Sequence, residues 1–351
     1  MDALPRRVLP GLNADVSALG AGCWTIGGPA TNGGVPIGWD GVDPDAAYAG
    51  LVRAHELGVS LFDTADVYGL GRSERLVGRL LATLDRSTVV VSSKVGYFAG
   101  TARHPYEPVQ MRHQFATTLD NLGTDYLDIY YLHSADFGPG DRYLPGAVEF
   151  MAELKADGLI RAVGMRAPHE FAEEWAVGHG TQAEHAARFL HLFDVIRPDV
   201  LTTRYNLLSP IYSDGETDIF SFARRHGVAM IVKQALGQGL LLKPDLWALP
   251  TFSRSDHRSR DPEFADAALS VLRRRLAPIR DRFGDSAAEL ARVALRYALQ
   301  TAPDAPALVG FRNADQIHIT ITSLGDPLTA DEVTGIRALL HPTADRKEPV
   351  S

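Results

Sequence analysis

Short apolar runs alternate along the chain with longer amphipathic stretches. Many of the runs are apolar or β-branched at successive positions, which is typical of strands that are buried on both faces. They predict strands at residues 19–24, 60–63, 88–93, 126–132, 162–165, 200–205, 229–233 and 307–310.

The stretches between these runs carry apolar residues at helical spacing, and several begin at a residue that favours helix caps. Asp43 precedes Pro44, which suits the first turn of a helix, and Gly58 ends the stretch that follows. Ser286 precedes Glu289 at the spacing of a capping box. The predicted helices are 44–57, 73–84 with Ser73 as its cap, 108–122, 145–157, 182–196, 219–226, 286–300, and 329–340 with Thr329 as its cap.

Eight predicted strands that alternate with helices indicate a parallel sheet closed as a (β/α)8 TIM barrel. No domain boundary is visible, so we expect residues 1–351 to form one domain. Turn-forming residues at 10–13 predict a hairpin over residues 7–19 that plugs the bottom of the barrel. Three long connections, 25–43, 166–199 and 235–264, follow strands and therefore lie at the end of the barrel where active sites form.

The chain has 351 residues, of which 45% are hydrophobic and 22% charged, as in a globular protein with a full core. Its net charge of -8 argues against nucleic acid or an anionic membrane as a partner. The single cysteine, Cys23, cannot form an internal disulfide bond, and we expect it to be small and buried. Because we find no membrane-length apolar run and no secretory leader, we expect a cytoplasmic protein.

Polar residues stand at or just after the predicted strand ends, namely Asp63, Tyr68, Lys94 and His133. A free tyrosine has a pKa of about 10 and is a poor acid at neutral pH, but a nearby ammonium group stabilises its phenolate. Lys94 can supply that charge, Asp63 can hold Lys94, and His133 can hydrogen-bond the oxygen that receives the proton. Such a set can protonate a carbonyl oxygen while a redox cofactor delivers hydride to the carbon, because no side chain is a hydride donor.

The same residues lie in motifs that resemble the aldo-keto reductase superfamily, in particular a bacterial branch of it. The similarity covers nearly the whole chain. The motifs are Phe62-Asp63-Thr64-Ala65 with Tyr68-Gly69, Ser73-Glu74, Ser93-Lys94, and Asp128 with Leu132-His133.

The resemblance implies an oxidoreductase that converts a carbonyl compound to an alcohol, or the reverse, with Tyr68 as general acid/base. Asp63, Lys94 and His133 complete the implied catalytic set. The implied cofactor is NADPH, bound in extended form with its nicotinamide in the barrel mouth. The implied partner is a small carbonyl compound.

The implied cofactor contacts lie at strand ends and in the connections that follow them. They are Arg166, Thr202, Lys233, Leu236, Gly237, Gly239, Gly310, Phe311, Arg312 and Gln316. Arg312 suits a 2′-phosphate, because guanidinium matches phosphate geometry. Some positions depart from the family pattern: Arg166-Ala167 stands for Ser-Asn, Thr202 for Gln, Lys233 for an aromatic residue, and Ile319-Thr320 for Glu-Asn.

Trp24, Tyr97 and Phe137 are expected to wall the substrate pocket, and charged residues beside them favour a polar or sugar-like substrate. The departures from the family pattern leave two other interpretations open. One is a redox-neutral enzyme that eliminates or isomerises with the same acid–base residues, and the other is a non-catalytic regulatory barrel. No histidines have the spacing of a zinc-protease site, so no metal is expected. The sequence does not predict the oligomeric state.

Overall fold

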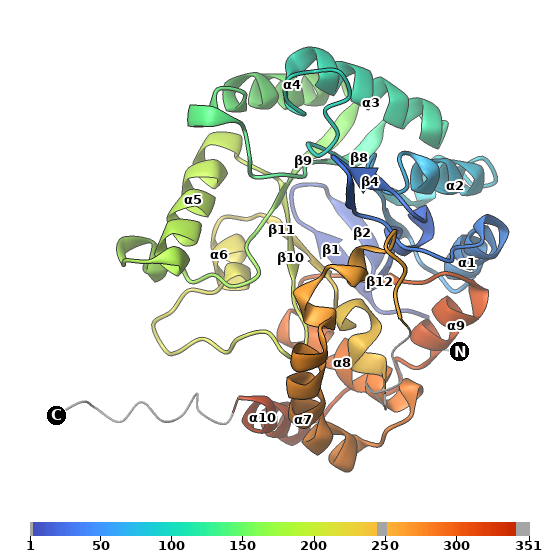
Figure 1. Ribbon diagram of the computed structural model, residues 1–351, viewed down its shortest axis with the longest axis vertical. Helices are drawn as coiled ribbons and strands as arrows, with labels where there is room; N and C mark the ends of the chain where they lie inside the picture. The colour runs from blue at the N-terminus through green and yellow to red at the C-terminus, as the bar shows by residue number, and fades with distance from the viewer. Residues whose placement is uncertain (1–2, 244–250, 342–351) are drawn as a thin grey trace.

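The predicted (β/α)8 barrel is present in the computed structural model, which describes residues 3–243 and 251–341. The barrel closes in the order β10-β11-β12-β3-β6-β7-β8-β9, with every neighbouring pair parallel. The helices surround the sheet (Figure 1). The strands are β3 Leu19–Gly22, β6 Leu61–Asp63, β7 Val90–Val95, β8 Leu127–Leu132, β9 Ile160–Arg166, β10 Val200–Arg204, β11 Ala229–Lys233 and β12 Ala307–Gly310.

Capping residues set where several of the helices begin. The carboxylate of Asp43 accepts from the N–H groups of the first turn of α1, and Ser286 forms a capping box at α8, both as predicted. Thr329 caps α10 as predicted and also forms a capping box there. The helices are α1 Pro44–Glu56, α2 Arg72–Leu81, α3 Pro108–Leu122, α4 Leu144–Ala156, α5 Thr181–Ile196, α6 Ile219–Arg225, α7 Asp266–Phe283, α8 Ala287–Thr301, α9 Ala314–Thr322 and α10 Ala330–Leu340. Helix α7, which contains Pro278, and helix α9 were not predicted from the sequence.

The prediction that Ser73 caps a helix was wrong. Helix α2 begins one residue earlier, after Gly71, which has a left-handed backbone. The buried hydroxyl of Ser73 instead donates to the carbonyl of Cys23 at 2.8 Å and accepts from the hydroxyl of Thr64 at 2.8 Å. Ser73 therefore connects α2 to the barrel and does not cap its own helix.

The predicted hairpin closes the bottom of the barrel. It consists of β1 Arg6–Leu9 and β2 Ala14–Ser17, which pair antiparallel. Its apolar side chains, Leu9, Leu12, Ala14 and Val16, pack in one cluster with inward-facing residues of the barrel strands. The barrel is therefore plugged at one end, and its functional groups gather at the other.

The barrel interior is filled above the hairpin by large side chains. Tyr131 on β8 is fully buried, and its ring fills the space beside Gly164 on β9, where a Cβ would lie 2.2 Å from Tyr131 Cδ1. Close packing of this kind requires glycine opposite the ring. Cys23, which follows β3, is also fully buried, as predicted, and burial raises the pKa of its thiol.

A short hairpin, β4 Thr31–Asn32 and β5 Val35–Pro36, lies in the long connection after β3. Within residues 3–243 and 251–341, none of the helices has the length and apolar composition that crossing a membrane requires.

Candidate active site

A ring of polar side chains lines the C-terminal end of the barrel. Along a barrel strand, side chains alternate between the interior and the surrounding helices. Ala229 and Ile231 belong to the interior cluster, so Lys233 at the end of β11 also points inward. The same alternation brings together the members of this polar ring: Asp63, Lys94, His133, Arg166, Arg204 and Lys233.

Asp63 and Lys94 form a buried ion pair within the polar ring. Lys94 Nζ donates to Asp63 Oδ2 at 2.7 Å and also to the carbonyl of Thr64. The other carboxylate oxygen, Oδ1, accepts from Ser92 Oγ at 2.6 Å. Burial lowers the pKa of Lys94, but Asp63 and Tyr68 outweigh this effect, so the net pKa is raised and the ammonium stays charged.

Tyr68 reaches the polar ring from the turn between β6 and α2. Lys94 Nζ lies 4.9 Å from the centroid of the Tyr68 ring. The centroid of the Tyr68 ring is 6.1 Å from that of His133 and 6.2 Å from that of Trp24. Burial raises the pKa of Tyr68, and the charge and hydrogen bond of Lys94 oppose the rise. Tyr68 is therefore protonated at neutral pH and has a proton to donate.

Glycine is required in the turn that carries Tyr68. Gly69 has φ of 64°, and a Cβ there would lie 1.9 Å from the carbonyl oxygen of Gly27. A larger residue would push the turn away from the loop after β3. The glycine of the sequence motif thus fixes where the phenol sits.

His133 follows β8 and is buried beside the cations of the polar ring. Burial, followed by the charges of Lys94, Arg166 and Lys233, holds the pKa of its imidazole well below the usual value. Its Nδ1 atom has no hydrogen-bond partner among the described residues. A neutral imidazole in this position can donate one hydrogen bond to a substrate oxygen.

The predicted wall residues of the substrate pocket fall into two groups. Trp24 lies beside Tyr68, and the ring of Tyr97 meets His133 edge-on, with centroids 4.6 Å apart. Phe137 is different, because it is 1% exposed and stacks on Tyr106 at 4.4 Å. Phe137 is therefore part of the core, and the expectation that it walls an open pocket was wrong.

The turn after β11 presents backbone to the barrel mouth. Gly237, Gln238 and Gly239 have consecutive positive φ angles of 54°, 54° and 89°, and a Cβ on Gly239 would meet nothing within 4 Å. Beyond the neighbouring strand β12, helix α9 begins behind its cap, Asn313. Its N-terminus adds the positive end of a helix dipole, and such ends bind phosphate groups.

Arg312 stands between β12 and α9. It is half-buried, with its guanidinium 5.5 Å from the centroid of Trp39, and it has no ion-pair partner among the described residues. The side chain of Gln316 accepts from the Arg312 N–H at 2.9 Å. Together with the turn at 237–239 and the exposed Gly310, these residues form a set that suits a dinucleotide diphosphate and an additional phosphate.

Three of the predicted cofactor contacts offer less than expected. The side chain of Phe311 is buried, and its N–H and carbonyl both bond the hydroxyl of Thr25. Leu236 is buried, and Thr202 is buried one inward position below Arg204. Phe311 therefore has no free backbone N–H for a cofactor, and Leu236 and Thr202 offer no exposed side chain.

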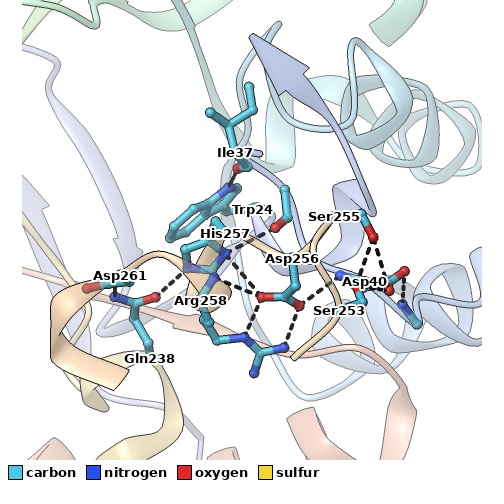
Figure 2. Close-up of polar contacts among 12 residues, drawn as sticks. Trp24, Ile37, Asp40, Gln238, Ser253, Ser255, Asp256, His257, Arg258 and Asp261 are labelled. Carbon is cyan, nitrogen blue, oxygen red and sulfur yellow. Dashed lines mark hydrogen bonds and ion pairs between the residues drawn. The ribbon is translucent and has the colours of Figure 1, made fainter. Parts of the chain in front are cut away.

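Part of the long connection predicted at 235–264 crosses the barrel mouth, but its contacts with the loop after β3 were not predicted. We name residues 251–265, which follow the turn after β11, the strap. The strap meets the loop after β3, where the His257 N–H donates to the carbonyl of Gly38 at 2.9 Å and Trp24 and His257 have centroids 4.4 Å apart (Figure 2). His257 also contacts the side chain of Gln238 at 2.7 Å. The strap thus lies over the turn at 237–239.

Asp256 holds the strap in place. Its carboxylate accepts from the Asp40 N–H at 2.9 Å and from Arg258 Nε and Nη2 at 2.8 and 2.7 Å (Figure 2). Burial alone would raise the pKa of Asp256, but these hydrogen bonds lower it to about 2. Contacts that depend on an ionised carboxylate are fully present when the pH is above the ordinary pKa of aspartate. Because the pKa of Asp256 is lowered, its contacts are lost only as the pH falls through about 2. The strap is therefore held across the usual pH range.

Within the described part of the chain, no group of three or more His, Cys, Asp or Glu residues is placed to hold a metal ion. The titratable groups gathered at the polar ring have the chemistry that proton transfer requires. A buried ion pair backs a protonated phenol, and a neutral imidazole lies across from it.

Comparison with known proteins finds similar proteins that match most of the chain. The model of the Aldo/keto reductase family matches residues 18–341. The chain is 30% identical to the NADH-specific methylglyoxal reductase of Escherichia coli, over 64% of this chain and 65% of that protein. It is 25% identical to aldo-keto reductase YhdN of Bacillus subtilis, over 94% of this chain and 91% of that one. The structure of a glycerol dehydrogenase from Gluconobacter oxydans matches with a TM-score of 0.69 and 25% identity, covering 99% and 98% of the two chains.

Proposed function

Because the chain belongs to the aldo/keto reductase family, we propose that it reduces the carbonyl group of a small molecule to an alcohol with NADPH, or catalyses the reverse. The observation that carries the proposal is the protonated Tyr68 hydroxyl beside the Asp63–Lys94 ion pair. Such a pair lowers the cost of forming a phenolate, which is what a tyrosine must do to act as an acid. We infer that Tyr68 is the general acid/base.

The proposed proton path uses side chains of this chain alone. His133 donates a hydrogen bond to the substrate oxygen and orients it, and Tyr68 gives its proton to that oxygen. Lys94 stabilises the phenolate that remains, and Asp63 keeps Lys94 charged and fixed. The nicotinamide cofactor, when bound, supplies the hydride.

The proposed cofactor site fits the chemistry of the group. Backbone at Gly237, Gly239 and Gly310 and the N-terminus of α9 suit the diphosphate, and Arg312 suits a 2′-phosphate. We assign the nicotinamide end to the polar ring, where Arg166 and Lys233 face inward. The strap covers the connection between the two ends.

The proposed function is tested by stoichiometry. Reduction of methylglyoxal should oxidise NADPH in a fixed ratio to the alcohol formed, followed by absorbance and product analysis. Product without cofactor oxidation would replace the proposal with a redox-neutral reaction. Cofactor binding without turnover of any aldehyde in a broad panel would indicate a regulatory barrel.

Replacing Arg312 with methionine should weaken NADPH binding and leave NADH binding unchanged. A charge-assisted hydrogen bond to phosphate is worth about 1.5–3 kcal/mol, which corresponds to a dissociation constant about ten- to a hundredfold higher. Quenching of tryptophan fluorescence on titration with each cofactor measures both constants. NADH is the matched control, because it lacks only the 2′-phosphate. An equal loss of affinity for NADPH and NADH would show that Arg312 does not bind the 2′-phosphate.

A further inference from the structure

Two cations of the polar ring lack a carboxylate partner among the described residues. Lys94 is neutralised by Asp63, and Arg204 is neutralised by Glu263 of the strap. Within the same described ranges, Arg166 contacts only the hydroxyl of Tyr97 and the carbonyl of His133, and Lys233 has no side-chain partner. This surplus of positive charge lies in a protein whose net charge is -8.

Arg166 and Lys233 are half-buried, and partly buried cations without a partner are costly. Moving a charge out of water is strongly unfavourable unless an opposite charge or hydrogen bonds compensate it. Burial, together with the charges of Arg166 and Lys94, holds the pKa of Lys233 well below its usual value, which reports the same lack of compensation. Cationic groups at such a site are therefore matched to something that binds there.

The cofactor of the proposed function does not supply the missing negative charge. Its reduced nicotinamide ring is neutral and its oxidised ring is cationic, and we assign its phosphates to the turn at 237–239 and to Arg312. The negative charge must therefore come from the other ligand of the polar ring.

We propose that this barrel selects carbonyl substrates that carry an anionic group, a carboxylate or a phosphate, and that Arg166 and Lys233 bind it. The inference rests on the proposed function and names its substrate class. The guanidinium group of an arginine can donate two parallel hydrogen bonds to two oxygens of a carboxylate or of a phosphate.

The geometry places the anion close to the reacting carbonyl. Arg166 Nη1 donates to Tyr97 Oη at 2.6 Å, and the ring of Tyr97 packs edge-on against His133. Arg166 also reaches the His133 carbonyl at 3.4 Å, which fixes the guanidinium beside the imidazole. Both of these bonds use Nη1, and among the described residues Nε and Nη2 of Arg166 make no hydrogen bond, so both remain as donors for the anion.

The test compares aldehydes of the same shape and different charge. The probes are 4-formylbenzoate, 4-formylphenyl phosphate and the neutral 4-formylbenzamide, each reduced with NADPH. We expect kcat/KM for at least one anionic probe to exceed that of the amide by about ten- to a hundredfold, the worth of a charge-assisted hydrogen bond. Preference for the carboxylate or for the phosphate identifies the anion.

Variants assign the preference to residues. Arg166→Met should bring the anion/amide ratio close to unity, and Lys233→Met should lower it in part. Arg142→Met removes an exposed arginine from the loop after β8 and should leave the ratio unchanged. If the amide is reduced as well as both anions, or if Arg142→Met has the same effect as Arg166→Met, the proposal fails.

A binding measurement separates this proposal from the proposed function. Calorimetric titration with benzoate or phenyl phosphate, and with benzamide as the neutral control, needs no turnover. Anion binding that is lost in Arg166→Met, with no aldehyde reduced, would contradict the proposed reductase function and support the anion site. Aldehyde reduction without charge preference and without anion binding would support the reductase function and contradict the anion site. A cooperative melting transition of Lys233→Met, compared with that of the wild type, confirms that the variant is folded.

Discussion

Tyr68→Phe should lower kcat/KM for carbonyl reduction by about a hundred- to ten-thousandfold, the contribution of a positioned general acid. The substitution removes only the hydroxyl, and Phe keeps the ring that lies between Trp24 and His133. Steady-state assays across a range of aldehyde concentrations measure the loss. We expect it in kcat, because the proton is transferred in the transition state.

Cofactor affinity is the control for Tyr68→Phe. It should stay unchanged, as judged by the same fluorescence titration, because phenylalanine keeps the ring of Tyr68 and the phosphate contacts are assigned to the turn at 237–239 and to Arg312. The wild-type pH profile gives a second check. Burial raises the pKa of Tyr68, so the acid form persists through neutral pH and reduction should decline only at alkaline pH. If Tyr68→Phe kept roughly a tenth of the activity, far above the loss expected for a general acid, the proton would have to come from another group.

Tyr131→Ala should destabilise the barrel by about 3–5 kcal/mol, the usual cost of removing a large aromatic side chain from a core. Tyr131 is fully buried, fills the space beside Gly164, and lies under the polar ring, where Lys94 Nζ is 5.7 Å from its ring centroid. Urea unfolding followed by circular dichroism measures the change in free energy.

Tyr131→Phe provides the matched control. The hydroxyl of Tyr131 is buried and has no hydrogen-bond partner among the described residues, so its removal should be neutral or stabilising. If Tyr131→Phe were as destabilising as Tyr131→Ala, the hydroxyl would have a partner that this packing does not explain.

The strand ends and the residues on them could be predicted because they depend on local pattern. A buried strand ends where its apolar run ends, so Asp63 and Lys233 lie at the strand ends that were predicted, and Lys94 lies within two residues of one. The capping box at Ser286 and the cap at Thr329 are also local, because each spans only one turn.

The features that were missed depend on contacts between distant segments. Ser73 has the composition of a cap, but a carbonyl 50 positions away takes its hydroxyl. The strap is joined to the first long loop by a hydrogen bond between Asp40 and Asp256, which are 216 positions apart. No local pattern encodes such a pairing. Phe137 likewise stands in a loop in the sequence, and only packing against Tyr106 shows that it is buried.

The buried thiol of Cys23 has a practical consequence for work on this protein. It is the chain's single cysteine, it has no exposed surface, and burial keeps it from forming a thiolate. Alkylating and maleimide reagents need an accessible thiolate, so the native fold should be inert to them. One cysteine introduced at an exposed position, such as Ser253 on the strap, would then be the sole site of attachment for a fluorophore or spin label. The movement of that segment could be followed without first removing any native residue.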